Sequence, residues 1–503
     1  MGYIRDQRVA ALLGATVAGD TFALAYRIPN ILRRLVAEGS MSAAFVPVFT
    51  GYLKEKEREE VWDFANRMFW TLSIVLAAVA VMGVIFSPLI IKAFTLNDSK
   101  IPLDLAVGLN RIMFPYIFFI GMSALAMAIL NSFRIFGVPA FTPVLLNLSV
   151  VTMSFLAGRF TEPSFALAIG VLIGGSLQLA VQLPLLWKQG MHFQFGISFR
   201  HPGIRRVGKL MLPGIMGIGV AQINFFVDQV FLTRKFLPEG SLTSVGFADR
   251  VMELVLGGYA IAVGTAILPM MSQHAADKNI PELKRTLAFS LRIVSFITFP
   301  AMVGLILMRR PIVQVLFQHG KFDSISTELT AWALLFYTIG LPFFASSKIL
   351  VPAFYSMQDM RTPVKIAAIS MVVNIILNFI LLKPLLNGGP AFATSLAGVV
   401  NSLMLYSVFV DRHGGIGSRA IGGALLKILV ASAGMGIFTW GLLRIVSFST
   451  RHGLIYRAGL LTVVLALATS VYFGLAWLMH CEELRDIYGI ARRKTVPPIA
   501  PIG

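Results

Sequence analysis

The sequence predicts an all-α polytopic membrane protein, and its composition is the first observation that does so. Of the 503 residues, 56% are hydrophobic and 13% are charged, against about 45–50% and about 25% in soluble domains. This excess of apolar residues excludes a disordered chain and leaves too little polar surface for a soluble enzyme of several domains. The same shortage excludes a nucleic-acid binder, although 43 Lys and Arg face only 24 Asp and Glu.

Long apolar runs are the second observation. A helix that crosses a bilayer needs about 20 mostly apolar residues, and twelve such runs are bounded by charged residues, Gly or Pro. They lie at 64–91, 103–130, 140–158, 163–188, 208–236, 242–272, 281–308, 325–355, 362–384, 389–411, 420–446 and 454–480.

The first sixty residues are expected to add two bent helices, near 1–16 and 20–53. Here Asp20 and the basic segment Arg27–Arg34 interrupt the apolar pattern. Charged residues at membrane depth are tolerated where they face water or protein instead of lipid. The expected total is about fourteen transmembrane helices.

Lys and Arg are distributed unevenly between the connections of these helices. The connections after even-numbered helices carry the larger share, beginning with Lys54, Lys56 and Arg58. Because basic loops stay on the cytoplasmic side, both chain termini are expected in the cytoplasm.

An internal repeat predicts how the helices are grouped. Pro47 and Pro269 follow similar apolar segments 222 residues apart, and Pro139 and Pro363 follow similar Ser-containing segments 224 residues apart. Duplication of a six-helix unit would give two lobes of the same orientation, related by an axis along the membrane normal, as in many transporters. The alternative is chance similarity in a biased composition. The expected divisions are an N-terminal lobe, a C-terminal lobe, an additional helix pair and a cytoplasmic tail, at 1–190, 191–412, 413–481 and 482–503.

Arginines inside apolar helices predict an anion-binding site. An ionisable residue at membrane depth costs about 2.5–3.5 kcal/mol on insertion scales, so each one needs a reason. Arg5, Arg33 and Arg250 belong to the first, second and eighth expected helices, and the repeat makes the last two helices equivalent. Guanidinium groups in excess over carboxylates suit a phosphate or pyrophosphate.

The substrate-binding set predicted from these helices also includes Asp6, Asp20 and Arg34. The alternative is internal ion pairing within the helices. It would join Arg34 to Glu38, Arg5 to Asp6 or Asp20, and Arg250 to Glu253.

A second constellation contains oxygen donors for a small cation. Asp228 lies in the seventh expected helix, Asn374 and Asn378 are four residues apart in the eleventh, and Thr394 lies early in the twelfth. Hard cations prefer such oxygen ligands. The alternative is ordinary hydrogen bonding between membrane helices.

Signals for an enzyme are weak. The seven histidines show no metal-ligand spacing, and no nucleophile elbow or Walker loop occurs. We therefore expect a transporter, driven by a gradient, the membrane potential or downstream consumption of its cargo.

Four segments carry a resemblance to a known family. They are Gly2–Asp6 (GYIRD), Pro29–Gly39 (PNILRRLVAEG), Ala248–Glu253 (ADRVME) and Phe354–Pro363 (FYSMQDMRTP). They resemble the MurJ (MviN) lipid II flippases of the multidrug/oligosaccharidyl-lipid/polysaccharide exporter superfamily, and the resemblance extends over nearly the whole chain.

The resemblance implies two six-helix lobes around a central cavity, and a last helix pair that helps to form a groove for the lipid tail. It also implies alternating access that carries the undecaprenyl-pyrophosphate-linked peptidoglycan precursor, lipid II, from the inner to the outer leaflet of the bacterial inner membrane. The implied partners are this lipid, membrane lipid and the cell-wall synthesis machinery, with no nucleic acid. Sodium is the one implied cofactor.

The resemblance also implies roles for single residues. Arg5, Arg33 and Arg250 match the family's cavity arginines, and Asp20 matches its acidic residue at the start of the second helix. The family's sodium site matches Asp228, Asn374, Asn378 and Thr394, although members often have Asp where Asn378 stands. A further segment before Gly2 is also implied, so the first helix is expected to be cut short.

Four alternative functions differ in the residues they require. A flippase for another polyprenyl-linked oligosaccharide would use the same arginines. A drug/cation antiporter of the same superfamily would have a cavity richer in carboxylates. A membrane-embedded transferase would need an acid/base or metal constellation at one membrane face, and an inactive scaffold would lose the cavity arginines.

Overall fold

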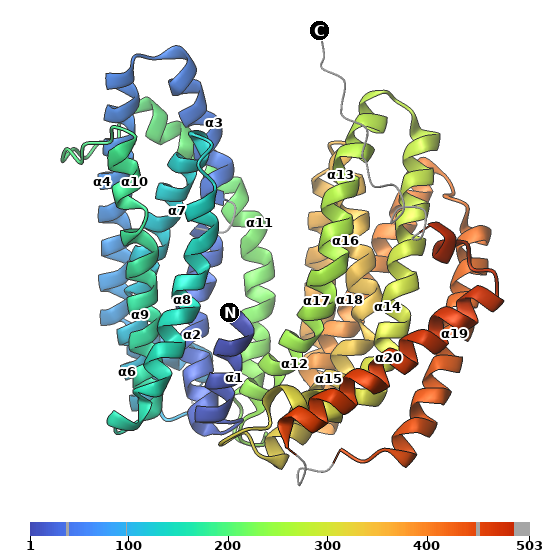
Figure 1. Cartoon of the computed structure of the whole chain (residues 1–503). Coiled ribbons are helices and arrows are strands. Elements are labelled where there is room, and N and C mark those ends of the chain that lie inside the picture. Colours follow the sequence, from blue (N-terminus) through green and yellow to red (C-terminus); the bar gives the residue numbers. More distant parts are fainter. Residues whose placement is uncertain (37–39, 97, 449–452, 487–503) are drawn as a thin grey trace. The chain divides into compact units, whose positions relative to one another are not determined.

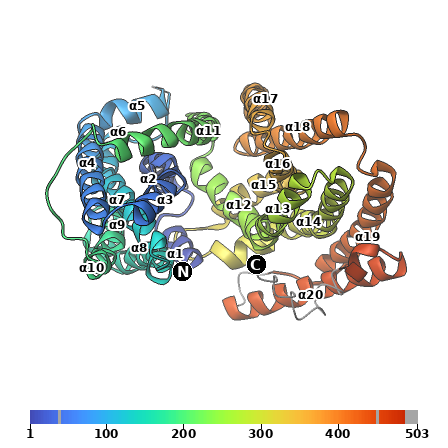
Figure 2. The same ribbon diagram turned by 90° about the horizontal axis from the view of Figure 1, so that it is seen from above.

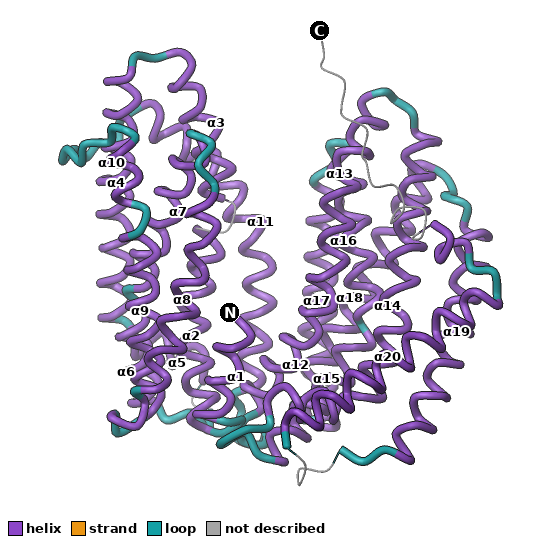
Figure 3. Tube along the Cα trace, in the orientation of Figure 1, coloured by secondary structure: helices purple, strands orange, loops and turns teal. Residues whose placement is uncertain are grey.

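The structure, a computed structural model, describes all residues except 37–39, 97, 449–452 and 487–503. Figure 3 shows helices joined by loops, and no strand is assigned within the described part of the chain. This confirms the predicted all-α class. The chain forms two compact units, Met1–Ser244 with Phe317–Leu329 and Val245–Leu316 with Thr330–Gly503. The finer boundaries expected from the repeat stay a prediction.

The first unit contains the helices of the N-terminal half (Figure 1). They are α1 (Gly2–Leu13), α2 (Val17–Val36), α3 (Ser40–Glu55), α4 (Arg58–Ile85), α5 (Ser87–Thr95), α6 (Leu103–Met113), α7 (Tyr116–Ser132), α8 (Gly137–Phe155), the 3-10 turn η1 (Ala157–Arg159), α9 (Pro163–Ala180), α10 (Leu183–Lys188) and α11 (Pro202–Leu232).

The chain passes from the first unit to the second within α12. The remaining elements are α12 (Ser241–Val255), the π-helical turn η2 (Leu256–Ala260), α13 (Ile261–Ala276), α14 (Ile280–Phe317), α15 (Ser324–Ile339), α16 (Leu341–Ser356), α17 (Arg361–Leu385), α18 (Gly388–His413), α19 (Ser418–Ile445) and α20 (Leu454–Leu478). The end of α14 and the start of α15 belong to the first unit.

Hydropathy separates the helices into two groups. Within the described residues, nine helical stretches are long and apolar enough to cross a membrane, or ten if the bent pair α15–α16 forms one span. These ten match ten of the twelve apolar runs predicted from the sequence. The other expected spans are α1, α2–α3, α11 and α12–α13, which carry most of the candidate site residues. The total of fourteen therefore stays a prediction.

Prolines explain why several predicted spans are broken helices. Pro88, Pro184 and Pro342 each stand at the first or second position of α5, α10 and α16. A proline at this position lacks the N–H that a continuous helix would use and suits the start of a new helix. The break between α15 and α16 bends the span by 46°. Each pair thus corresponds to one apolar run of the sequence.

Small residues allow close packing between α8 and α9, which lie side by side in Figures 1 and 2. A Cβ atom at Gly174 would lie 2.8 Å from the Cα atom of Leu146, and one at Gly170 would lie 3.0 Å from the Cα atom of Val150. Membrane helices approach closely where such residues face each other. A larger side chain at Gly174 would push the two helices apart.

Asp359 fixes the turn between α16 and α17. Its carboxylate accepts hydrogen bonds from the N–H groups of Arg361 (3.1 Å) and Thr362 (3.0 Å), and from the Thr362 hydroxyl (2.6 Å). The Arg412 guanidinium at the end of α18 donates to it at 2.8 Å. The Thr362 hydroxyl, followed by these other donors, lowers the pKa of Asp359 below its usual value. The carboxylate thus caps α17 and ties it to α18.

The lowered pKa predicts an acid-dependent stability. A carboxyl whose pKa is lower in the folded state stabilises the fold above its unfolded pKa, and this stabilisation is lost as the pH falls through the folded pKa. We expect Asp359→Asn to cost about 1 kcal/mol near pH 6, as other helix caps do. The difference from the parent chain should shrink as the pH falls below the usual Asp pKa of about 3.9 and through the lower pKa of the folded state. Thermal unfolding in detergent as a function of pH measures this, and a difference that does not change with pH would contradict it.

Candidate functional site

The first candidate residues, Arg5 and Asp6, form an ion pair on α1. The Arg5 Nε and Nη2 atoms lie 2.9 Å and 2.6 Å from Asp6 Oδ1. Their side chains keep 15% and 17% of their surface exposed. The pairing alternative therefore holds for Arg5, with Asp6 and not Asp20 as its partner. A guanidinium has five N–H donors, and the pair with Asp6 uses only the Nε and Nη2 atoms of Arg5.

Three arginines lie within two turns at the C-terminal half of α2. Arg33 Nε donates to Asn30 Oδ1 at 2.9 Å. The Arg27 and Arg34 guanidinium groups lie over the Phe225 ring of α11, 5.0 Å and 5.6 Å from its centroid. An aromatic face attracts a cation without neutralising its charge. This part of α2 is therefore strongly basic.

The expected partner of Arg34 on its own helix, Glu38, lies outside the described residues. The structure therefore does not test the expected ion pair between Arg34 and Glu38.

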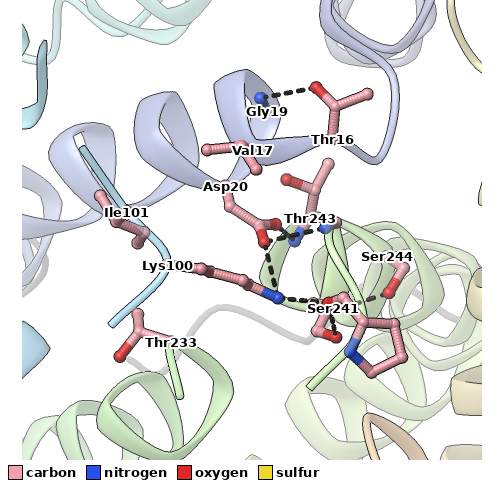
Figure 4. A network of polar contacts seen from close by, with 12 residues as sticks. Thr16, Val17, Gly19, Asp20, Lys100, Ile101, Thr233, Ser241, Thr243 and Ser244 are labelled. Carbon is pink, nitrogen blue, oxygen red and sulfur yellow. Dashed lines mark hydrogen bonds and ion pairs between the residues drawn. The ribbon is translucent and has the colours of Figure 1, made fainter. Parts of the chain in front are cut away.

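Asp20 lies at the centre of a polar network that joins three segments of the first unit (Figure 4). It is fully buried. Its Oδ2 atom accepts the Gly240 N–H at 3.0 Å, and its Oδ1 atom accepts the Thr243 N–H at 2.8 Å. The Lys100 ammonium lies 3.3 Å from Oδ2 and also donates to the Pro238 carbonyl oxygen. Asp20 thus acts as an N-terminal cap of α12 supplied by another helix.

The backbone at Gly240 makes this cap possible. Gly240 has φ +77°, and a Cβ atom there would lie 1.9 Å from the carbonyl oxygen of Ala15. A side chain is excluded both by the left-handed conformation and by the approach of the α1–α2 turn. Gly240 thereby brings the first turn of α12 within hydrogen-bond distance of Asp20.

Lys100, in the connection between α5 and α6, supplies the positive charge of the network. Its side chain is only 9% exposed. Burial lowers its pKa below the usual value for lysine, and the neighbouring Asp20 carboxylate opposes that effect. The ammonium and the carboxylate are buried together, so removing either one leaves the other without its partner.

Arg250 lies on α12 in the second unit. Its Nη1 atom is 2.8 Å from Glu253 Oε2, and each side chain keeps 48% of its surface exposed. An exposed pair of this kind contributes little to stability. The pairing alternative again holds, but half of the Arg250 side chain stays accessible. Arg5 and Arg33 belong to the first unit, so a cavity shared with Arg250 stays a prediction.

The oxygen-rich constellation is partly brought together. Asn374 Nδ2 donates to Thr394 Oγ1 at 3.1 Å, and Asn378 Nδ2 donates to Asn374 Oδ1 at 2.8 Å. Both asparagines are fully buried between α17 and α18. This is the interhelical hydrogen bonding considered as the alternative, and the same oxygens remain suitable donors for a hard cation. Asp228 is buried on α11 in the first unit.

Comparison with known proteins decides the family. A family model described as "Lipid II flippase MurJ" matches residues 9–459. The probable lipid II flippase MurJ of Vibrio cholerae is 35% identical over 498 residues, which cover 97% of this chain and 94% of the relative. The chain belongs to the MurJ lipid II flippase family. Members of this family are transporters and not enzymes, as the sequence predicted.

Further relatives and solved structures agree with this membership in the MurJ family. The lipid II flippase MurJ of Burkholderia cenocepacia is 33% identical over 95% of this chain and 94% of its own. A solved lipid II flippase MurJ in an inward closed conformation matches with a TM-score of 0.79, 29% identity and 97% coverage of each chain. An inward-facing MATE family multidrug resistance transporter matches with a TM-score of 0.65 at 14% identity, covering 84% of this chain and 94% of that one. The latter likeness shows the fold alone.

Lys100, Gly240 and Thr243 are the site residues that sequence reasoning missed. A lysine in a connection between two helices, such as Lys100, indicates topology but not a buried contact. Gly240 and Ser241 begin a helix with residues typical of such a start, which was the one available signal. The contact of Asp20 with residues more than 200 positions away has no local pattern.

The Asp20 network predicts a large effect of a small substitution. Asp20→Asn keeps the shape of the side chain but leaves the Lys100 ammonium without its counter-charge. Breaking a buried ion pair from one side typically costs about 3–5 kcal/mol. Thermal unfolding in detergent measures the change, and Asp63→Asn is the matched control, because Asp63 pairs with Arg67 on an exposed face. The control should change stability by less than about 1 kcal/mol. Equal effects of the two substitutions would contradict a central role for Asp20.

Proposed function

We propose that the chain is a lipid II flippase that moves the undecaprenyl-pyrophosphate-linked peptidoglycan precursor from the inner to the outer leaflet of the bacterial inner membrane. Similarity over almost the full length to bacterial relatives with this name supports the proposal. The observation that carries it is the presence of Arg5, Arg33 and Arg250 on helices outside the clearly apolar group. An ionisable residue at membrane depth raises the free energy of the inserted protein, so arginines on these segments need a function that offsets this cost.

Chemistry links these arginines to the pyrophosphate of the cargo. A guanidinium stays charged at any physiological pH and presents a planar fork that matches phosphate oxygens. Arg33 and Arg250 provide such forks from α2 and α12, and Arg34 and Arg27 add positive charge to α2.

Alternating access requires that contacts at one end of these helices form and break. The cap that Asp20 provides for α12 connects the start of α2 to the start of α12, whose later turns carry Arg250. In our proposal this network is intact in one state of the cycle and open in the other. When it opens, the Asp20 carboxylate and the Lys100 ammonium gain access to water, which offsets the lost contacts.

The proposal also includes the orientation and the partners. The excess of Lys and Arg in alternate connections supports cytoplasmic termini. Contact with the cell-wall synthesis machinery follows from the need to pass the precursor on. Another polyprenyl-pyrophosphate oligosaccharide would present the same charged group, so the lipid that copurifies with the chain distinguishes these cargoes.

Substitution of the cavity arginines tests the proposed function. Arg33→Gln and Arg250→Gln should fail to restore growth of a strain depleted of its lipid II flippase, although both proteins insert in the membrane. Binding of lipid II to the purified variants should weaken roughly 30-fold or more, since losing one partner of a charged hydrogen-bonded pair costs at least about 2 kcal/mol. Arg67→Gln removes the same charge from an exposed pair and should restore growth. Full growth with both cavity variants would contradict the proposal.

We further propose that sodium binds the side-chain oxygens of Asn374, Asn378 and Thr394 on α17 and α18. The hydrogen bond between Asn374 and Thr394 supports it, because it brings two hard donors of α17 and α18 together. Sodium chloride should then raise the unfolding temperature more than choline chloride of equal concentration. Thr394→Val should abolish the difference, and Thr462→Val, at an exposed position of α20, should keep it. Equal stabilisation by both salts would exclude the sodium site.

A further inference from the structure

The C-terminal helices α19 and α20 pack on each other and on α14. Ile428 and Met435 of α19 and Tyr472 of α20 belong to one buried cluster with Phe296 of α14. The Tyr472 hydroxyl donates to the Phe296 carbonyl oxygen at 2.6 Å. This anchors the middle of the helix pair and gives it a defined buried face.

An arginine occupies one end of this buried face. Arg457 lies in the first turn of α20, on the same side as Leu461 and Val464, and keeps only 7% of its surface exposed. Its Nε and Nη1 atoms are buried, and no described residue accepts a hydrogen bond from either of them. A long side chain at a helix end normally extends to the interface instead. The burial of Arg457 therefore needs an explanation.

The helix pair itself offers no counter-charge. From Arg412 to Cys481 the sequence contains no Asp or Glu, while Lys427, Arg444 and Arg457 are all basic. A buried charge without a partner costs several kcal/mol, so such groups are paired in stable proteins. The compensating anion must come from outside α19 and α20.

The start of α20 adds backbone donors at the same place. The helix follows Gly453, which has no side chain to cap it, and the N–H groups of Leu454 and Ile455 have no acceptor within the helix. Side chains on a helix lean towards its N-terminus, which brings the Arg457 guanidinium towards these N–H groups. A guanidinium next to the N-terminus of a 25-residue helix is a favourable environment for a phosphate.

Neighbouring residues indicate that this end lies at the level of lipid headgroups. The Arg444 guanidinium lies 4.4 Å from the centre of the Trp440 ring, and Trp440 is 53% exposed. Tyr456 and Ile455 beside Arg457 are also exposed. Exposed Trp and Tyr next to basic residues are typical of the membrane–water interface, where the phosphates of lipids lie.

We propose that the end of the α19–α20 pair formed by Gly453–Arg457 binds the phosphate group of a membrane lipid. Arg457 supplies the charge and the first turn of α20 supplies N–H donors. The lipid completes the charge balance of the helix pair and stabilises its attachment to α14. None of its residues belongs to the arginines that we propose for cargo binding.

Lipid titration of the purified full chain tests this proposal. Delipidated protein in detergent is titrated with phosphatidylglycerol, with diacylglycerol of the same acyl chains, and with inorganic phosphate. Native mass spectrometry measures bound lipid, and thermal unfolding measures stabilisation. The parent chain should bind phosphatidylglycerol at least tenfold more tightly than diacylglycerol, and inorganic phosphate should stabilise it less than the lipid does.

Two variants connect this preference to Arg457. Arg457→Gln should lose the preference for phosphatidylglycerol and should be at least as stable as the parent chain in lipid-free detergent, because it removes an uncompensated charge. Arg444→Gln, at the same end of the pair but above the exposed Trp440, should keep the preference. Arg457→Lys retains the charge and should keep part of the preference for phosphatidylglycerol.

Several results would overturn the proposal. They are equal binding of phosphatidylglycerol and diacylglycerol by the parent chain, an unchanged preference in Arg457→Gln, and equal losses in Arg457→Gln and Arg444→Gln. Stabilisation by inorganic phosphate that equals that of the lipid would contradict a lipid ligand. If Arg457→Gln does not fold, the comparison of phosphatidylglycerol with diacylglycerol on the parent chain still tests whether the chain binds a lipid phosphate.

Discussion

The buried Asp20 carboxylate joins three segments of the first unit of this protein. A carboxylate without water is stable only when its oxygens accept enough hydrogen bonds and face a positive charge. Asp20 meets both conditions through the Gly240 and Thr243 N–H groups and the Lys100 ammonium. These contacts join α2, the first turn of α12 and the connection before α6. The starts of α2 and α12, the helices that carry Arg33 and Arg250, are therefore joined in this structure.

The distribution of charge explains the division between scaffold and candidate site. Among the described residues, nine helical stretches are long and apolar enough to cross a membrane, whereas α1, α2, α11 and α12 carry most of the candidate site residues. Charge in membrane helices lowers stability unless the protein compensates for it. Asp6, Glu253 and the Phe225 ring provide local compensation.

The sequence predicted what depends on local pattern, and it missed what depends on tertiary contact. Apolar length located ten spans that the structure contains. Helical spacing placed Asn374 and Asn378 on one face, where they bond to each other and Asn374 bonds to Thr394. The proline breaks inside spans were missed, because a proline in an apolar run does not show whether the run kinks or restarts. The role of Lys100 and the burial of Arg457 depend on elements packed from distant parts of the chain. No periodicity encodes such contacts.

The central claim is that the Asp20 carboxylate holds the first turn of α12, and hydrogen exchange tests it most directly. First-turn amides of a helix have no intrahelical acceptor, so Gly240 and Thr243 should be protected only through Asp20. In the parent chain both amides should exchange slowly. In Asp20→Ala both should exchange as fast as other first-turn amides, while amides within α17 should stay unchanged. Fast exchange at Gly240 and Thr243 in the parent chain, or unchanged protection in Asp20→Ala, would contradict the account.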